Sequence, residues 1–178
     1  MVGRWIITRS RIIIGFGIAI ALQFFILTGM VVKAAMPLWT GTEVRIKTVP
    51  VDPRSLFRGN YARLNYEISQ LKAEFLQSDR ALRIGEVVYV RLTAGDDQLY
   101  TLTSASLDKP DSGVFLRGRL TSAHPPYRIK YGIEAFFAPK QKALKLEDDL
   151  RQGGIAILMV TESGDVALKD VVPNSPAK

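Results

Sequence analysis

The chain has 178 residues, enough for one domain of ordinary size plus an accessory segment. It contains no cysteine, which excludes disulfide bonds and thiolate–metal sites. The formal net charge is +7, and Arg4, Arg9 and Arg11 supply three of these charges, which leaves +4 for the rest of the chain. Both signs are interspersed there, with no long basic run and no aromatic platform, so nucleic acid is not expected as a partner.

The first predicted element is a single transmembrane α-helix over residues 12–32, after a basic segment at 1–11. The stretch IIIGFGIAIALQFFILTGMVV is uncharged, and its length of about 21 residues at about 1.5 Å each matches the roughly 30 Å hydrocarbon layer. Only Lys33 follows the stretch closely, so the N-terminus is expected in the cytoplasm and the rest outside. The rival interpretation is a cleaved signal peptide, whose apolar core is shorter, roughly 7–15 residues.

Within this span, one polar residue and four small residues predict contact with another helix. Gln23 is nearly central, and interhelical hydrogen bonds of carboxamides contribute about 0.6–2 kcal/mol. Gly15 and Ala19 are four residues apart, as are Gly17 and Ala21, so a second helix could approach closely. The alternative is that these residues are incidental features of a lone anchor.

After a linker at residues 33–42, residues 43–172 are predicted to form a compact β-rich (α+β) exported domain, with a flexible tail at 173–178. Alternating or continuous apolar runs predict its strands. They are EVRIKTVPV (43–51), YARLNYEI (61–68), EVVYVRLT (86–93), LYTLTSAS (99–106), VFLRGRLT (114–121), YRIKYGIEAFF (127–137), IAILMVT (155–161) and VALKDV (166–171). TESGDVAL predicts a tight hairpin between the last two.

Two further segments, 70–83 and 140–154, space their apolar residues as short helices do. Eight strands and two short helices favour one β-rich core over a doubly wound sheet. YARLNYEI has the cleanest alternation, with Leu64, Tyr66 and Ile68 predicted to face inward. We therefore expect this strand to be central in the domain.

GNYARLNY (59–66) resembles the signature of the GDYXXLXY family of bacterial membrane-anchored proteins. Gly59, Tyr61, Leu64 and Tyr66 match the signature, and VDP, LFRG and GIEAFFAPKQKALKLE (132–147) are also similar to that family. The likeness spans most of the exported domain. It implies a bacterial inner membrane, or another energy-transducing membrane, and an integral membrane protein or complex as partner. It implies no reaction, because the family has no established activity.

Asn60 stands where the family signature has aspartate. This position therefore supplies no carboxylate to bind a metal or accept a proton, whereas asparagine still bonds to the backbone of its own turn. We expect an architectural role for the motif, with Gly59 providing an unusual backbone angle at the start of the strand. No metal and no cofactor are expected.

The polar residues around the motif are the predicted recognition surface: Arg54, Arg58, Arg63 and Asn65. Guanidinium groups that converge at one end of a strand would bind a carboxylate, a phosphate or an acidic loop of a partner. The alternative is that these arginines pair with Asp52, Glu67 or solvent.

No catalytic motif is intact. His124 is the only histidine, and HExxH, GxSxG and Walker sequences are absent. AMPLWTGTEV (35–44) is similar to the start of the exported domain of signal peptidases, but alanine stands where their nucleophilic serine is expected, before Met36. Ser55 with Lys72 is a weak candidate dyad. The prediction is a non-enzymatic single-pass accessory protein, a subunit or assembly factor of a membrane complex. The alternative is an envelope hydrolase or a small-anion-binding domain.

Overall fold

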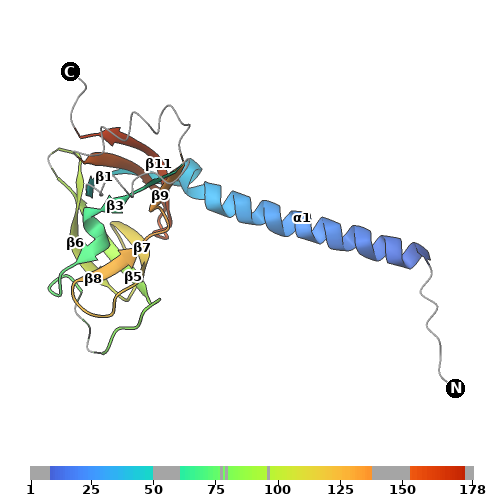
Figure 1. The fold of residues 1–178 in the computed structure, drawn as a ribbon, viewed down its shortest axis with the longest axis horizontal. Helices are drawn as coiled ribbons and strands as arrows, with labels where there is room; N and C mark the ends of the chain where they lie inside the picture. The colour runs from blue at the N-terminus through green and yellow to red at the C-terminus, as the bar shows by residue number, and fades with distance from the viewer. Residues whose placement is uncertain are drawn as a thin grey trace. The chain divides into compact units, whose positions relative to one another are not determined.

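The computed structural model describes residues 9–49, 61–76, 78, 80–95, 97–137 and 153–174. The chain forms two compact units, Met1–Met36 and Pro37–Lys178. Most of helix α1 (Arg9–Thr40) belongs to the first unit, and the second unit is a β-rich domain (Figure 1). One long apolar N-terminal helix followed by a β-rich domain is the fold class that the sequence predicts, and this prediction is confirmed.

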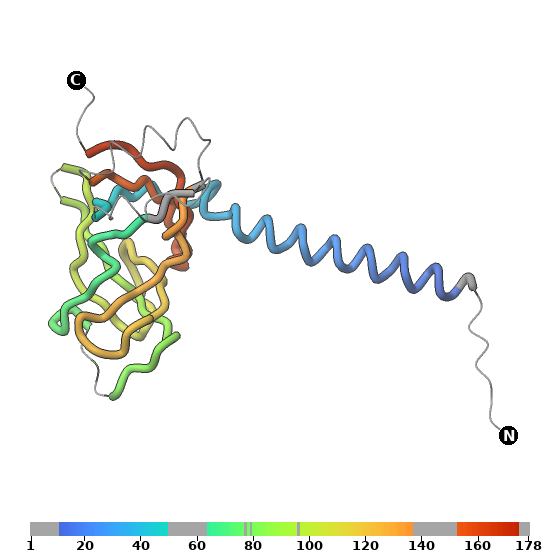
Figure 2. The backbone as a smooth tube through the Cα atoms, in the orientation of Figure 1, coloured from blue at the N-terminus to red at the C-terminus, as the bar shows by residue number. Residues whose placement is uncertain are grey.

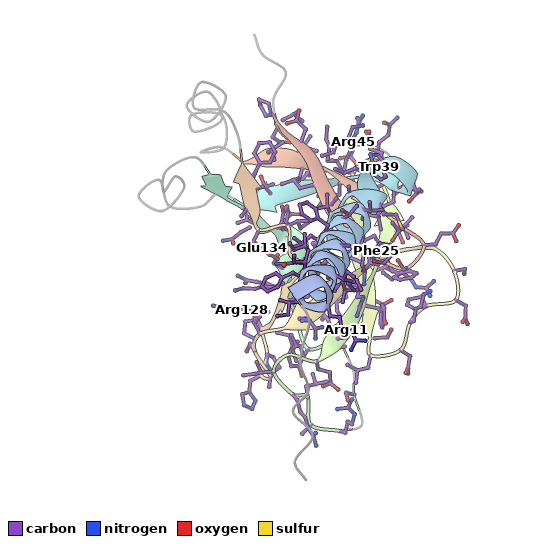
Figure 3. The ribbon with its side chains drawn as sticks, turned by 90° about the vertical axis from the view of Figure 1, so that its right-hand side faces the viewer. Arg11, Phe25, Trp39, Arg45, Arg128 and Glu134 are labelled. Atoms are coloured by element: carbon purple, nitrogen blue, oxygen red, sulfur yellow. The ribbon has the colours of Figure 1, made fainter. Side chains whose placement is uncertain are left out.

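Helix α1 is apolar on every side. Its large apolar side chains, including Phe25 in Figure 3, are 43–78% exposed, and none of its most apolar window is buried within the chain. Arg11–Thr40 has the length and composition of a membrane span. The helix continues past Lys33 to Thr40, so the segment predicted as a linker at 33–42 is helical over most of its length.

The last turn of α1 belongs to the second unit and is followed by Gly41. The Gly41 N–H donates to the carbonyl of Pro37 at 2.9 Å. A Cβ at Gly41 would lie 2.5 Å from that same oxygen and 2.8 Å from the backbone nitrogen of Val160. Only glycine fits there without a backbone shift, because real Cβ atoms essentially never approach so closely.

The β-rich domain consists of two main antiparallel sheets and one short ladder. Their orders are β11-β10-β1-β3 and β4-β8-β7-β5-β6, and β2 pairs with β9. Figure 1 shows the domain as a ribbon and Figure 2 shows its backbone as a tube. The strands are β1 (Thr42–Val49), β2 (Tyr61–Arg63), β3 (Asn65–Tyr66), β4 (Gln70–Leu71), β5 (Val87–Ala94), β6 (Tyr100–Ser106), β7 (Val114–Leu120), β8 (Tyr127–Lys130), β9 (Ala135–Phe137), β10 (Gly154–Val160) and β11 (Val166–Pro173).

Side chains from both sheets form one hydrophobic core. Val44 and Ile46 of β1 and Leu158 of β10 contribute from the first sheet, and Val88 and Val90 of β5 contribute from the second. Each of these strands alternates buried and more exposed residues, because successive side chains of a strand point to opposite faces. The period-two pattern of the sequence therefore determines which face of each sheet lies inside.

Most predicted strands are present, and the predicted tight hairpin after β10 is closed by hydrogen bonds between Thr161 and Asp165 and between Gly164 and Thr161. The helix predicted at 70–83 is wrong. Its first residues form β4, and Phe75 accepts a backbone hydrogen bond from Ala105 in β6, so the segment links the two edge strands of the second sheet. The helix predicted at 140–154 lies almost wholly outside the described residues, and β10 begins at its last residue.

The strand predicted at 61–68 is divided into three parts. β2 pairs with β9, β3 pairs with β1, and Glu67–Ser69 form a 3-10 turn, η1. The expected position as the central strand is therefore wrong: this segment passes from one sheet to the other. Its alternation nevertheless holds, since Leu64, Tyr66 and Ile68 are buried.

Candidate functional site

The motif segment and the segment from β8 to β9 run side by side and are paired at both ends. At one end, Leu71 pairs with Tyr127 and Gln70 pairs with Arg128. At the other end, the backbone of Arg63 pairs with Ala135. Between these points the segments separate, because η1 interrupts one and a loop at 131–134 interrupts the other.

Two buried tyrosines connect the separated segments. The Tyr66 hydroxyl donates to the carbonyl of Ile133 at 2.5 Å, and the Tyr131 hydroxyl donates to the carbonyl of Ile68 at 2.6 Å. Each tyrosine thus bonds to the backbone of the opposite segment. We call this pair of contacts the tyrosine brace. Tyr66, the second tyrosine of the family motif, therefore has a structural role, because the buried carbonyl of Ile133 would be destabilising without a hydrogen-bond donor.

Glu134 fixes the loop that receives the brace. Its two carboxylate oxygens accept the N–H groups of Tyr131 at 2.6 Å and Gly132 at 3.1 Å, and its carbonyl accepts the N–H of Leu64 at 2.9 Å. Burial raises the pKa of Tyr66 and of Tyr131 well above the ordinary value, and the negative charge of Glu134 raises both further. Both hydroxyls therefore remain protonated donors at neutral pH.

A groove of about 1090 Å³ opens between the two braced segments. Its lining is mostly polar and includes Asn65, Glu67, Gln70, Arg128 and Lys130. Figure 3 labels Arg128 and Glu134, which lie on the same flank of the domain. The groove offers the carboxamides of Asn65 and Gln70, the carboxylate of Glu67 and the cations of Arg128 and Lys130, which suits recognition of a polar partner segment.

Ser69 lies in the same groove, and its Oγ is buried without a hydrogen-bond partner among the described residues. A buried hydroxyl normally has a partner in the protein or in ordered water. Ser69 therefore adds a hydroxyl with no described partner to the residues that line the groove.

The predicted recognition residues are only partly described. Asn65 is exposed and lines the groove. Arg63 contributes its backbone to β2, and nothing is described of its side chain. Arg54 and Arg58 lie outside the described residues, as do Gly59 and Asn60 of the motif. Convergence of these arginines with Asn65 stays a prediction.

The predicted helix-contact residues lie along α1 and are exposed in the part of the chain that the structure describes. A Cβ placed on Gly15 or Gly17 would have no neighbouring heavy atom within 4 Å. Ala19, Ala21 and Gln23 are exposed. The surface that the sequence predicts for a second helix is therefore open.

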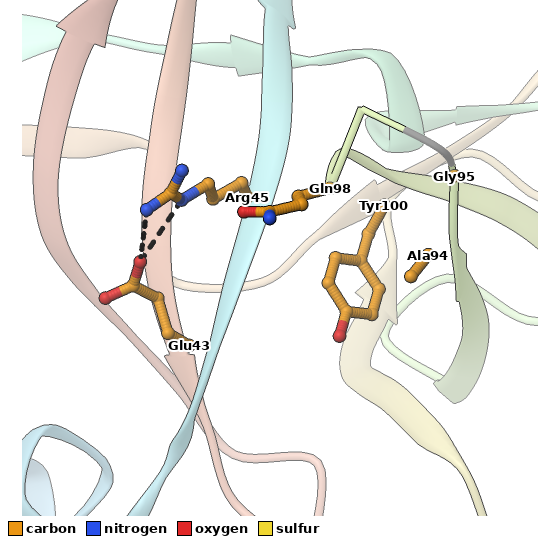
Figure 4. A pocket seen from close by; sticks show the side chains of 6 residues that line it. All are labelled: Glu43, Arg45, Ala94, Gly95, Gln98 and Tyr100. Carbon is orange, nitrogen blue, oxygen red and sulfur yellow. Dashed lines mark hydrogen bonds and ion pairs between the residues drawn. The ribbon is translucent and has the colours of Figure 1, made fainter.

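A smaller cavity of about 260 Å³ lies where β1 meets the β5–β6 hairpin (Figure 4). Arg45 and Glu43 line it and bond to each other at 3.1 Å, and Lys169 also contacts Glu43, at 3.1 Å. These two bonds lower the pKa of Glu43. The charges of this cavity are mutually satisfied, so it has little capacity for chemistry.

No group of three potential metal ligands occurs among the described residues. His124 is exposed, and its carbonyl accepts a hydrogen bond from Ser122 at 2.9 Å. Lys72 lies 3.7 Å from Glu74, and Ser55, the other member of the candidate dyad, is outside the described residues.

Sequence reasoning did not single out Tyr131 or Glu134. The available signal was the similarity of the segment beginning at Gly132 to the same family that the motif resembles. The brace explains why two segments so far apart in sequence belong together: Tyr66 and Ile133 are separated by 67 residues.

No curated protein and no solved structure matches the chain significantly. A family model described as GDYXXLXY protein matches residues 23–171, which is most of the chain and includes both segments of the tyrosine brace. The chain therefore belongs to the GDYXXLXY family.

Proposed function

We propose that the protein is a single-pass, membrane-anchored accessory protein, a subunit or assembly factor of a larger membrane complex. The single observation that carries this proposal is α1, which exposes apolar side chains on every face and buries none of its most apolar window. A lipid bilayer accounts for that surface, since a helix apolar all round is otherwise found inside a large protein core.

The positive-inside rule gives the orientation. The N-terminus, with Arg4, Arg9 and Arg11, stays in the cytoplasm, and the β-rich domain lies on the other side of a bacterial inner membrane or another energy-transducing membrane. The motif has no catalytic geometry in its described part: Leu64 and Tyr66 are core residues, and the Tyr66 hydroxyl is engaged by Ile133. This supports a binding role over an enzymatic one.

Two surfaces make the contact with the partner. In the bilayer, Gln23 and the small residues of α1 present a face to a helix of another integral membrane protein. Outside, a polar segment of the same partner contacts the motif side of the groove, at Asn65, Glu67 and Gln70.

Affinity purification of the full chain in mild detergent tests the proposal. We expect a stoichiometric integral membrane protein to copurify. Gln23→Leu removes the carboxamide and should lower recovery of the companion roughly threefold or more, from the size of one interhelical hydrogen bond. Gln23→Asn retains a carboxamide and should preserve recovery.

Recovery of the protein alone, in detergents that preserve other complexes, would contradict an accessory role. Release of the full-length chain from membranes by salt washing would contradict the anchor itself. The hydrolase alternative predicts instead that His124→Ala abolishes an activity without affecting the unfolding midpoint.

A further inference from the structure

The outward face of β7 and β8 is basic. Arg117 and Arg119 of β7 and Arg128 and Lys130 of β8 are exposed, and they alternate with residues that face the core. Because the two strands are neighbours in the second sheet, these four side chains project from the same surface. We call them the basic face.

The charges of the basic face are poorly compensated. Arg119 and Lys130 are direct cross-strand partners, and like charges in that arrangement repel each other. Arg117 lies 3.5 Å from Asp165, which is the only ion pair that the basic face makes with a described residue. Arg119 donates to the carbonyl of Gly85 at 3.0 Å, which does not neutralise it.

Several other cations of the domain differ in this respect. Arg45 and Lys169 both pair with Glu43, and Arg80 pairs with Glu86. On β7 and β8, by contrast, four exposed cations have one ion pair with a described residue, and a net positive surface of this kind favours an anionic surface opposite it.

An exposed apolar residue accompanies the basic face. Ile84 is 72% exposed, more than any other large apolar residue described outside α1, and it lies with Arg117, Arg119 and Lys130 along a groove of about 530 Å³. Glu134 borders this groove, but its carboxylate is bonded to backbone N–H groups. Cations beside a projecting apolar side chain are typical of surfaces that bind the headgroup region of a membrane.

The basic face begins close to the point where the chain leaves α1. Only Gly41 separates the last residue of the helix from β1, and Thr42 pairs with Val160 at the end of β10. The hairpin after β10 then contacts the basic face, because the N–H of Arg117 donates to the carbonyl of Gly164 at 2.8 Å. A domain attached so closely to its anchor stays at high effective concentration near the bilayer surface.

We propose that the basic face, with Ile84, docks the domain onto anionic lipid headgroups of the membrane that holds α1. The ligand is the phosphate of anionic phospholipids, bound collectively by guanidinium and ammonium groups, with Ile84 entering the boundary between headgroups and acyl chains. This inference rests on the membrane anchoring proposed above. An acidic segment of a partner protein is the competing occupant. The lipid surface is favoured because it explains both the spread of the cations over two strands and the exposed Ile84.

The full chain in lipid nanodiscs provides the test. Since the protein has no cysteine, a single Arg83→Cys substitution places one fluorophore beside Ile84, and Glu74→Cys places a reference fluorophore on another turn. Nanodiscs of neutral phosphatidylcholine are compared with nanodiscs containing phosphatidylglycerol, each with a nitroxide quencher on a fraction of the headgroups. Quenching of each fluorophore then reports its proximity to the lipid surface.

We expect the Arg83→Cys label to be quenched several-fold more in anionic than in neutral nanodiscs, and about 1 M salt to abolish the difference, because the screening length is then about 3 Å. R119Q/K130Q should reduce the docked-to-undocked ratio roughly tenfold or more, given the contribution of each basic residue near an anionic surface. K47Q/K169Q removes the same charge from β1 and β11 of the first sheet and should leave quenching unchanged.

Equal quenching in both nanodiscs, or an equal loss in K47Q/K169Q, would overturn the inference. If the Arg83→Cys fluorophore became shielded only after a partner protein was added, the basic face would bind that partner. That result would overturn the inference as well. A chain that inserts into nanodiscs without charge-dependent quenching would leave the anchor intact. A chain that does not insert at all would overturn the anchor, and this inference with it.

Discussion

Replacing Tyr66 with phenylalanine isolates the hydrogen bond of the tyrosine brace. The side chain is 1% exposed and keeps nearly its full volume in this substitution, so no cavity is created. What changes is that the Ile133 carbonyl loses the hydroxyl that donates to it at 2.5 Å. A buried acceptor left without a partner costs about 1–3 kcal/mol. The Tyr66→Phe variant should therefore lose about that much free energy of unfolding.

Urea unfolding of the full chain in detergent, followed by far-ultraviolet circular dichroism, measures this loss, and the thermal midpoint should fall by about 2–8 °C per kcal/mol. Tyr127→Phe is the matched control, because Tyr127 is half-buried and its hydroxyl bonds to no described residue. It should lie within about 0.5 kcal/mol of the unmodified protein. If Tyr66→Phe were as stable as this control, the structural role given to the motif tyrosine would be refuted.

Three further predictions concern the same domain. The pKa values of Tyr66 and Tyr131 are raised in the folded protein, so the stability that their protonated hydroxyls contribute is complete below about pH 10 and is lost as the pH rises above it. Between pH 8 and 11, the urea midpoint of Y66F/Y131F should therefore fall less steeply than that of the unmodified protein. Gln98 has a φ of 61°, which glycine adopts at lower cost, so Gln98→Gly should raise the unfolding free energy by about 0.5–1 kcal/mol, measured by urea titration. Glu134→Gln places an amide donor against a backbone N–H and should cost about 1–3 kcal/mol, whereas Glu67→Gln, at an exposed position, should change the urea midpoint little.

The fold could be predicted where the pattern is local. The alternation of Leu64, Tyr66 and Ile68 correctly identifies the buried face of the motif segment. The division of that segment could not be predicted, because it depends on strands that are distant in the chain: β2 pairs with β9, whereas β3 pairs with β1. Periodicity records which side of a strand is apolar and carries no information about which neighbour the strand pairs with.

The same reasoning applies to the candidate site. The sequence predicts a recognition surface of arginines around the motif, since guanidinium groups bind carboxylates and phosphates. The structure also brings Tyr131 and Glu134 to the motif from a segment more than sixty residues away: the Tyr131 hydroxyl donates to the carbonyl of Ile68, and the carbonyl of Glu134 accepts the N–H of Leu64. Hydrogen bonds to backbone atoms so distant in the chain leave no spacing pattern in the sequence, so these contacts could not be predicted from it.

The pairing of β1 with β10 imposes an order on the making of this protein. Thr48 exchanges two hydrogen bonds with Gly154, 106 residues further along, at 2.8 and 3.0 Å. During synthesis, β1 therefore lacks its main pairing partner, β10, until nearly the whole polypeptide has been made. A chain that ended between β1 and β10 would leave β1 with an unpaired edge, which could pair with a strand of another chain.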